Sequence, residues 1–413
     1  MSLETTDACS NLMSRECNPS SVSNIEVINT RSDTETTVEH HGHNDSENSS
    51  SDNSGSKRPL EQDDAVQQKD VTKAIKVDTS LGNVVAGHYN NLEEQGLAVR
   101  NQSRILHMRN FNNWIKSFLI NKHMQEVRES VPADQRIVAI DLGCGKGGDL
   151  LKWTKANIRH LVCVDIAETS VNQAKERFEY TKKKRNGAPT FSAEFIVADC
   201  TKVRFQSLLR DPCMKVHIVS CQFAFHYCFE SLRQAETMIK NATSSLSSGG
   251  YFILTIPDAN FIMKQLSRGG GSSFGNEVFR IEFPEDRGAN PPLFGDRYQF
   301  YLEGVVNCPE FLVHQPTLKS LCKKYGLTCV YQKRFSEVYK EAMQEPQSRG
   351  LLHKMTALEL YPSADGSQSS NNPREYESAK DHLDDNKQSS VLTLSASEWD
   401  AINVYTAFAF KKC

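Results

Sequence analysis

The chain has 413 residues, 38% of them hydrophobic, which is enough for one large domain or two ordinary ones. No apolar run approaches the roughly 18 residues that a membrane span requires, so we expect no membrane association. None of the 12 cysteines stands in a C-x-x-C pair, so we expect no metal site and reduced thiols in an intracellular protein. The net charge of -3 is uneven, because residues 1–80 carry 15 Asp and Glu against 7 Lys and Arg. The remainder is mildly basic, which suits a polyanionic substrate without requiring one.

The first 83 residues are rich in Ser, Asn, Asp, Glu and Thr and contain no aromatic residue. Such a segment cannot bury enough surface to offset its ordering entropy, so residues 1–83 are predicted to be a disordered acidic tail. Order is expected from about Val84 onward. The ordered domain is therefore placed at residues 84–413.

A helical pattern begins at Asn110. Its apolar stripe recurs at helical spacing and consists of Phe111, Trp114, Ile115, Phe118 and Leu119. Asn112, Asn113 and Lys116 fall on another face of this helix. That polar face is either plain surface or, since it comes just before the next feature, a cover over a ligand.

A short apolar run, residues 137–142, is interrupted only by Asp141 and followed by glycines at 143, 145, 147 and 148. This order predicts a buried strand, a tight turn and a helix start, with glycines that let the backbone approach a ligand closely. The acid argues against a bare phosphate as the ligand. The spacing fits the dinucleotide-binding G-x-G-x-x-G pattern only loosely. It more closely resembles the first motif of the S-adenosylmethionine-dependent methyltransferases, and incidental glycines are the weaker alternative.

A second strand is predicted at residues 161–165, and it ends in Asp165, 22 residues after Gly143. An acid at this position can bind both ribose hydroxyls of a nucleoside, so it favours an adenosine-type ligand without choosing between cofactors. The alternative role, a helix N-cap, is the weaker one because the glycine turn precedes it.

Further strands are predicted at 193–199, 216–222 and 251–256, with helices at 168–184 and 232–246 between them. Alternating strands and helices indicate an α/β fold with a doubly wound, mostly parallel sheet. Ligands of such sheets bind at the carboxyl ends of the strands. The polar residues at those ends are Asp141, Asp165, Asp199 and Gln222.

Residues 258–312 break this alternation. Apolar and polar residues alternate around 279–283 and 298–302, which predicts an inserted antiparallel hairpin, a natural substrate lid. The rest of the chain is predicted to contain a helix at 318–325, a strand at 327–330, a helical stretch at 335–359, a mobile polar segment at 363–390 and a closing strand at 402–410.

Four segments, Arg109–Trp114, Asp141–Lys152, Cys221–Tyr227 and Pro309–Val313, together resemble the eukaryotic mRNA cap guanine-N7 methyltransferases, of the vertebrate nuclear type. The resemblance covers residues 84–413. It implies a class I S-adenosylmethionine-dependent methyltransferase domain, transfer of a methyl group to N7 of the 5′ guanosine cap, and capped RNA as substrate. It further implies a regulatory N-terminal tail, a nuclear location, a small activating subunit and contacts with the transcription machinery.

The resemblance also implies roles for single residues. Those expected to hold S-adenosylmethionine are Lys116 (its carboxylate), Gly143, Asp165 (its ribose), Asp199 (the adenine region), Gln222 and Tyr227. Those expected to hold the cap are Asn112, Asn113, Lys146, Lys152, Arg177, His226, Glu310 and Tyr405. Among the cap residues, Lys146, Lys152 and Arg177 suit the triphosphate, and Glu310 can accept hydrogen bonds from the guanine N1–H and amine. Without the resemblance, His226 would be read as a core histidine.

No catalytic acid or base is expected, because guanine N7 has a free lone pair at neutral pH. Alignment of the reacting atoms can supply on the order of 7–11 kcal/mol. The alternatives are a class I methyltransferase for small molecules, a dehydrogenase, and an inactive S-adenosylmethionine-binding scaffold. The inserted hairpin, Lys146 and Lys152 count against the small-molecule enzyme, and the dehydrogenase is a distant third. The intact glycine loop and acids count against the scaffold, which turnover would exclude.

Overall fold

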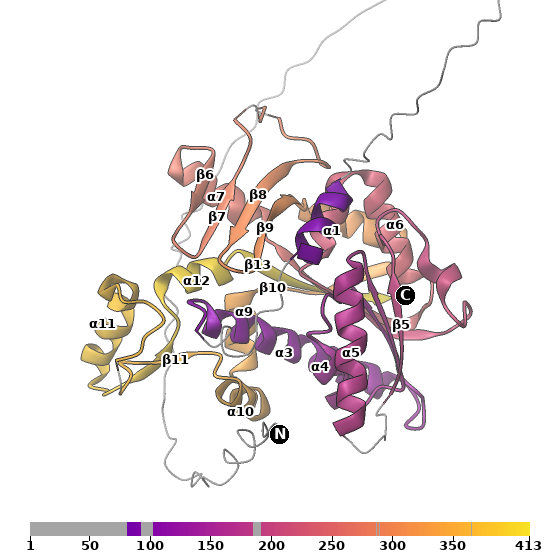
Figure 1. The fold of residues 1–413 in the computed structure, drawn as a ribbon, viewed down its shortest axis with the longest axis horizontal. Coiled ribbons are helices and arrows are strands. Elements are labelled where there is room, and N and C mark those ends of the chain that lie inside the picture. Colours follow the sequence, from indigo (N-terminus) through magenta and orange to yellow (C-terminus); the bar gives the residue numbers. More distant parts are fainter. Residues whose placement is uncertain (1–80, 92–101, 185–190, 286, 289, 365) are drawn as a thin grey trace, which may run out of the picture. The chain divides into compact units, whose positions relative to one another are not determined.

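The computed structural model describes residues 81–91, 102–184, 191–285, 287–288, 290–364 and 366–413 (Figure 1). Nearly all of the predicted acidic tail lies outside these residues. Its last three positions, 81 to 83, are helical, because α1 spans Leu81–Asn91. Helix α1 therefore starts slightly before the predicted boundary at residue 84.

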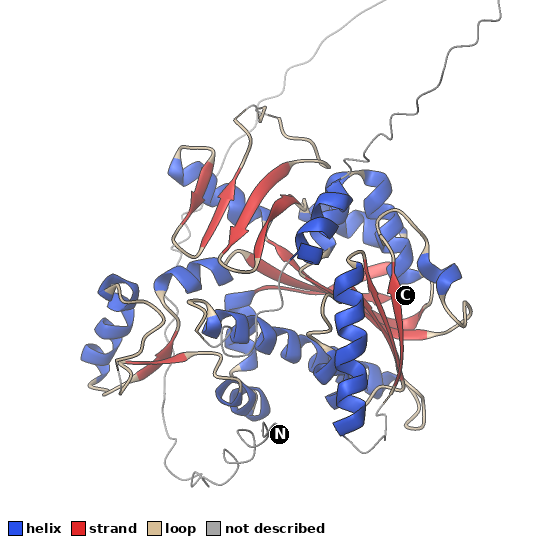
Figure 2. Ribbon diagram, viewed as in Figure 1, coloured by secondary structure: helices blue, strands red, loops and turns tan. Residues whose placement is uncertain are grey.

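A seven-stranded sheet forms the centre of the fold (Figure 2), with strand order β10-β13-β5-β4-β1-β2-β3. Its strands are β1 (Val138–Leu142), β2 (His160–Asp165), β3 (Ser192–Val197), β4 (Val216–Gln222), β5 (Leu246–Pro257), β10 (Leu327–Arg334) and β13 (Tyr405–Lys412). The five strands from β5 to β3 pair in parallel, while β13 pairs antiparallel with both β5 and β10. The predicted doubly wound, mostly parallel sheet is confirmed.

Helices cover both faces of this sheet, which explains why its strands read as nearly continuous apolar runs. Ala139 and Ile218 belong to a core shared with α3 (Leu106–Ser130) and α4 (Leu150–Lys155). The next residues along the same strands, Ile140 and Val219, belong to a core shared with α6 (Leu232–Thr243) and α8 (Gln315–Lys324). The remaining elements between β1 and β5 are α5 (Glu168–Lys184), η2 (Phe205–Leu208) and η3 (Phe225–Glu230).

The insertion after β5 is larger than a hairpin. Helix α7 (Ala259–Gly269) is followed by a four-stranded antiparallel sheet of β6 (Ser273–Gly275), β7 (Phe279–Glu282), β8 (Arg297–Leu302) and β9 (Val306–Phe311). The alternation was read correctly, since Phe279 and Ile281 are buried whereas Arg280 and Glu282 are exposed. The buried face shares a core with α3 and with the C-terminal helices.

The C-terminal region differs most from the sequence interpretation. The predicted helical stretch 335–359 is two helices, α9 (Phe335–Ala342) and α10 (Pro346–Lys354), and residue 359 already belongs to strand β11. The 363–390 segment, predicted to be mobile, contains η4 (Pro373–Tyr376) and helix α11, which buries Ala379 and Leu383. The elements of this region after α10 are β11 (Glu359–Tyr361), α11 (Glu377–Asn386), β12 (Val391–Thr393) and α12 (Ala396–Ile402). None of the described helices is long and apolar enough to cross a bilayer.

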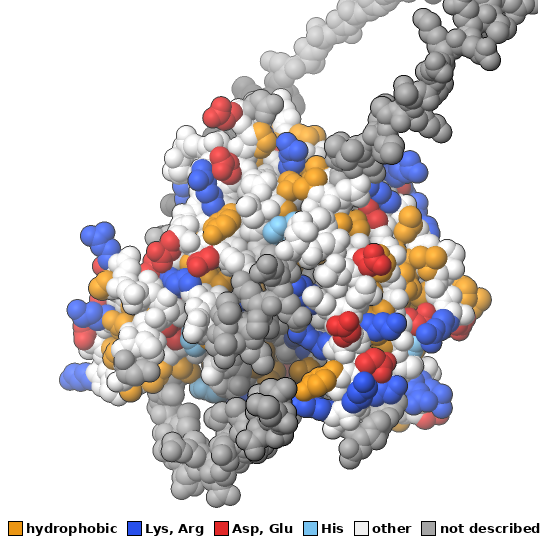
Figure 3. Space-filling view, viewed as in Figure 1, with side chains coloured by type: hydrophobic (Ala, Val, Ile, Leu, Met, Phe, Trp, Pro, Cys, Tyr) orange, Lys and Arg blue, Asp and Glu red, His pale blue; other side chains and the backbone are white. Residues whose placement is uncertain are grey.

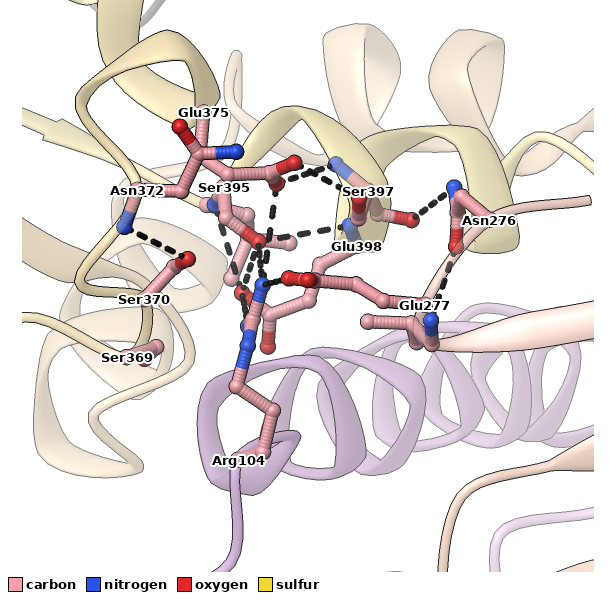
Figure 4. Close-up of polar contacts among 12 residues, drawn as sticks. Arg104, Asn276, Glu277, Ser369, Ser370, Asn372, Glu375, Ser395, Ser397 and Glu398 are labelled. Carbon is pink, nitrogen blue, oxygen red and sulfur yellow. Dashed lines mark hydrogen bonds and ion pairs between the residues drawn. The ribbon is translucent and has the colours of Figure 1, made fainter.

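A polar cluster around Arg104 joins the start of α3 to three other elements (Figure 4). The guanidinium lies 2.9 Å from Glu277 Oε1, 3.6 Å from Glu375 Oε2 and 3.5 Å from Glu398 Oε2. It also donates to Ser395 Oγ at 3.1 Å. Glu398 is fully buried, so this cluster contains one carboxylate that water does not reach.

We expect the Glu398→Gln substitution to change the pH dependence of stability. Burial raises the pKa of Glu398 from 4.5 to about 7, although Arg104 opposes the rise. A carboxyl group whose pKa is higher in the folded state stabilises below pH 4.5, and that contribution is lost as pH rises to about 7. The melting temperature of the variant, measured relative to wild type, should therefore increase between pH 5 and about pH 8.

The control is Glu277→Gln, whose side chain contacts the same Arg104 but is 52% exposed. Its melting temperature relative to wild type should be nearly constant over the same pH range. Parallel pH profiles for wild type and Glu398→Gln would show that Glu398 does not titrate as described.

Candidate functional site

A cavity of about 410 Å³ lies at the carboxyl ends of β1, β2, β3 and β4. Its walls come from the glycine turn, from the strand ends, and from α1, α3 and η3. All six residues expected to hold the cofactor line it: Lys116, Gly143, Asp165, Asp199, Gln222 and Tyr227. The sequence motifs thus converge on one space, as expected for a doubly wound sheet.

The glycine turn depends on backbone conformations that other residues rarely adopt. Gly143, Gly145 and Gly147 have φ values of 70°, 50° and 71°, in the left-handed region. The turn is tied to β2, because the Gly143 N–H donates to Val164 O at 2.8 Å. A Cβ atom on Gly143 would lie 2.5 Å from Cβ of Ala224. Gly143 therefore allows both the turn and the close approach of the loop after β4.

We expect Gly143→Ala to destabilise the protein by about 2–4 kcal/mol, the sum of left-handed strain and overpacking. The matched control is Gly148→Ala, because a Cβ atom there meets nothing within 4 Å and its φ is not in the left-handed region. The control should stay within about 0.5 kcal/mol of wild type. Chemical unfolding of the full chain measures both changes, and equal effects would contradict the stated role of Gly143.

Asp165 is held in a fixed position at the end of β2. Its Oδ2 accepts a hydrogen bond from the Gly145 N–H at 2.8 Å, and its Oδ1 accepts one from the Ala167 N–H at 2.9 Å. Burial raises the pKa of Asp165, and these backbone donors oppose the rise. Each oxygen keeps a lone pair, so both can accept from a ligand that carries two adjacent hydroxyls.

Asp199 and Gln222 form the neighbouring wall. Asp199 Oδ1 accepts from the backbone N–H of Thr201 at 2.9 Å, and a Cβ atom on Gly82 of α1 would lie 3.1 Å from Asp199 Oδ2. The Gln222 side chain donates to Ser220 Oγ at 3.1 Å, while its Oε1 is buried without a hydrogen-bond partner. A buried, unpaired acceptor in a cavity wall indicates a site built for a ligand with a polar donor.

A buried ion network occupies the corner beside α3. Asp149 Oδ1 lies 2.8 Å from Lys116 Nζ and 2.6 Å from Lys152 Nζ. Although burial would raise the pKa of Asp149, the two lysines lower it to about 2. Burial and the charge of Asp149 raise the pKa of nearby Asp141 to about 7. Two lysines thus face one firmly ionised carboxylate, which leaves positive charge at this corner for an anionic ligand group.

Lys152 points into this network rather than into solvent. Its Nζ also donates to Asn113 Oδ1 at 3.2 Å, and its side chain is only 10% exposed. Asn112 precedes Asn113 on α3, and its Oδ1 is buried without a hydrogen-bond partner. The structure therefore brings Asn113 and Lys152 together, as residues of one polar group next to the cavity.

A second polar group lies behind Tyr227. His226 Nε2 is 3.2 Å from Glu310 Oε1, with the two side chains 2% and 3% exposed. Both ring nitrogens of His226 are buried without a hydrogen-bond partner among the described residues, so the Nε2 contact with Glu310 is a close approach rather than a hydrogen bond. Tyr405 is also buried and packs edge-on against Phe223 at 4.9 Å between ring centroids. Three expected cap residues from η3, β9 and β13 are thus assembled within one buried region.

Tyr227 links this group to the cavity. It lines the cavity, and its hydroxyl lies 3.2 Å from the hydroxyl of Tyr89 and 3.3 Å from Cys308 Sγ. Cys308 is two residues from Glu310 on β9. The cofactor-side residues and the cap-side residues are therefore neighbours.

The two remaining expected cap residues are basic. Lys146 is half-buried and lines the cavity, whereas Arg177 lies on the exposed surface of α5. Lys and Arg side chains gather around α5 on the face shown in Figure 3, interspersed with a few acidic ones. The two residues are thus separate, one in the cavity wall and one on the surface.

Sequence reasoning missed several residues of the site. Leu81, Val85 and Tyr89 place α1 in the cavity wall, although Leu81 was assigned to the disordered tail and the other two only to the start of order. Asp149 was not singled out, despite standing next to the glycines. Only part of its signal was local, because Lys152 is three residues further on whereas Lys116 is 33 residues away in the sequence.

The sheet topology, the glycine turn and the strand-end acids define a class I S-adenosylmethionine-dependent methyltransferase. A family model described as "mRNA (guanine-N(7))-methyltransferase domain" matches residues 72–413. The chain therefore belongs to the mRNA cap guanine-N7 methyltransferase family and transfers a methyl group from S-adenosylmethionine to N7 of the mRNA cap guanosine. The dehydrogenase alternative is wrong.

Curated relatives agree with this assignment. The mRNA cap guanine-N(7) methyltransferase of Drosophila melanogaster is 47% identical over 336 residues, which cover 80% of this chain and 77% of the relative. The Caenorhabditis elegans protein of the same name is 41% identical over 339 residues, covering 79% and 86%. The mRNA cap guanine-N(7) methyltransferase 1 of Arabidopsis thaliana is 35% identical over 336 residues, covering 79% and 80%.

Proposed function

We propose a division of the site into two compartments. The cavity binds S-adenosylmethionine through Lys116 at its carboxylate, Asp165 at its ribose, Asp199 in its adenine region, and Gly143, Gln222 and Tyr227. The buried group of His226, Glu310 and Tyr405 binds the guanine. The observation that carries the proposal is the place of Tyr227, which lines the cavity and contacts the residue two positions from Glu310.

The mechanism requires orientation rather than proton transfer. S-adenosylmethionine supplies an activated methyl group when it is bound. Glu310 accepts from N1–H and the exocyclic amine of guanine, so the opposite edge, which carries N7, is left free to face the cavity. The protein thereby fixes the nucleophile, and such positioning can contribute on the order of 7–11 kcal/mol.

Lys146 and Arg177 are proposed to contact the cap triphosphate, since both are basic, Lys146 lines the cavity and Arg177 lies on the exposed surface of α5. Lys152 does not contact the cap in this proposal. It positions Asn113 and Asp149 through its hydrogen bond and ion pair with them. Asn112 and Asn113 on α3 are the remaining residues proposed to bind the mRNA cap. This arrangement assigns to Lys152 an indirect part in cap binding.

We also propose a nuclear location, a small activating subunit and contacts with the transcription machinery. The resemblance of the four sequence segments to vertebrate nuclear cap methyltransferases supports these three proposals. Imaging of the tagged full chain in cells tests the location, and a diffuse cytoplasmic signal would contradict it.

The direct test is methyl transfer from labelled S-adenosylmethionine by the full chain. The acceptors are GpppG-capped RNA and the same RNA with an uncapped 5′ triphosphate. Label should appear at guanine N7 of capped RNA only, as determined by nuclease digestion and chromatography. Label on the uncapped RNA as well would show that the group of His226, Glu310 and Tyr405 does not select the cap, and cofactor binding without transfer to capped RNA would contradict the proposed alignment of the two compartments.

A further inference from the structure

The carboxylate of Glu310 is held by a hydrogen bond at one oxygen and has a close neighbour at the other. Tyr298 donates its hydroxyl hydrogen to Glu310 Oε2 at 2.8 Å, and His226 Nε2 lies 3.2 Å from Oε1. The Tyr298 contact is built into the sheet, because Tyr298 on β8 is the direct cross-strand partner of Glu310 on β9. Both oxygens of the carboxylate therefore have a fixed neighbour.

Tyr298 is itself immobilised. Its side chain is completely buried, and its ring packs against Phe283 at 5.5 Å between centroids. Burial and the adjacent Glu310 raise the pKa of the Tyr298 phenol well above its usual value, so the hydroxyl stays protonated and can donate. The hydroxyl thus has one position and one role, which is to donate to Glu310.

We propose that Tyr298 is a positioning residue that locks Glu310 and thereby makes the site require the 2-amino group of guanine. This inference rests on the proposed role of Glu310 as the acceptor for the guanine edge. A carboxylate that is free to rotate could accept from N1–H alone with either oxygen. A carboxylate held by Tyr298 at Oε2 presents two acceptors at set positions, and a base without the amine leaves one of them unpaired and buried, which is costly.

The competing explanation is that Tyr298 only fills the core of the second sheet. Its ring is part of a large apolar cluster, so its loss would then lower activity equally for every cap. The two explanations differ in one measurable quantity, the ratio of kcat/KM for a guanosine cap to kcat/KM for an inosine cap. Inosine keeps N1–H and N7 but lacks the amine.

The experiment compares wild type with Tyr298→Phe, which keeps the ring and removes only the hydroxyl. For GpppG-capped RNA we expect kcat/KM to fall about 10-fold, mostly through KM. For the inosine-capped RNA it should fall less than about 3-fold, so the preference for guanosine decreases. The matched control is Tyr301→Phe on the same strand, where the side chain is 41% exposed and points to the other face. The control should leave the ratio unchanged.

Each outcome has a separate meaning. Equal losses on both caps, or no loss, overturn the positioning role of Tyr298. If wild type itself shows no preference for guanosine, the proposed role of Glu310 fails first. Should Tyr298→Phe be too unstable to assay, Phe283→Leu loosens the ring but keeps the hydroxyl. It is expected to lower the same ratio, and an unchanged ratio there also overturns the inference.

Discussion

Asp165→Ala is expected to raise the dissociation constant for S-adenosylmethionine about 100-fold or more. The substitution removes an acceptor for two ribose hydroxyls, and hydrogen bonds to a charged group contribute about 1.5–3 kcal/mol each. It also frees the Gly145 and Ala167 N–H groups that Asp165 now binds at 2.8 Å and 2.9 Å. The substitution therefore removes the hydrogen bonds that hold the glycine turn together with those proposed to hold the ribose. Isothermal titration calorimetry on the full chain measures the change.

Two further variants separate these effects. Asp165→Asn keeps one oxygen acceptor and nearly the same shape, so its loss of affinity should be smaller than that of the alanine variant. Glu168→Ala, three residues further on and exposed at the start of α5, should bind as wild type does. If Asp165→Ala bound the cofactor normally, the ribose assignment would be wrong and the carboxylate would serve only the turn.

The parts of the fold that could be predicted are those with a local signal. Strands β1, β2 and β4 are short apolar runs with an acid or amide at the end, and each was found within one or two residues. The glycine turn was found because its conformations exclude most other residues. Such features depend on neighbours in the sequence, so a single chain is sufficient to read them.

The parts that were missed depend on distant partners. Helix α11 lies in a polar segment and buries only Ala379 and Leu383, so its apolar signal is too weak to separate from a mobile loop. The sequence of residues 335–359 has a helical pattern throughout, although the helix breaks before Pro346. Pro346 is the first residue of α10, a position that proline favours. These errors arise where tertiary contacts decide the structure.

The site shows the same division. Asp165 and Gln222 were identified because strand ends of a parallel sheet meet at one edge. Tyr89 could not be identified in this way, since its partner Tyr227 is 138 residues away in the sequence. Tyr298 was noted only as one member of an alternating strand, because its role depends on the register that sets it opposite Glu310.

Glu310→Gln is expected to lower kcat/KM on capped RNA about 100-fold or more, with cofactor affinity unchanged. The amide would keep the shape of the carboxylate but present one donor to guanine N1–H and amine, which are themselves donors. It would also lose the charge-assisted hydrogen bond from Tyr298, now 2.8 Å long. Residue 310 is only 3% exposed, so donors that face each other there cannot form hydrogen bonds with water instead. Steady-state kinetics with GpppG-capped RNA measure the loss.

The control for this prediction is Glu282→Gln, on the exposed face of the same small sheet. Because its side chain is 50% exposed and pairs only with Arg280 at 3.2 Å among the described contacts, its removal should leave cap kinetics within about 2-fold of wild type. Titration with S-adenosylmethionine then shows whether Glu310→Gln keeps an intact cavity. Unchanged cap kinetics in Glu310→Gln would remove the guanine assignment. A joint loss of cofactor affinity would instead mean that the two compartments, which meet at Tyr227, do not act as separate binding sites.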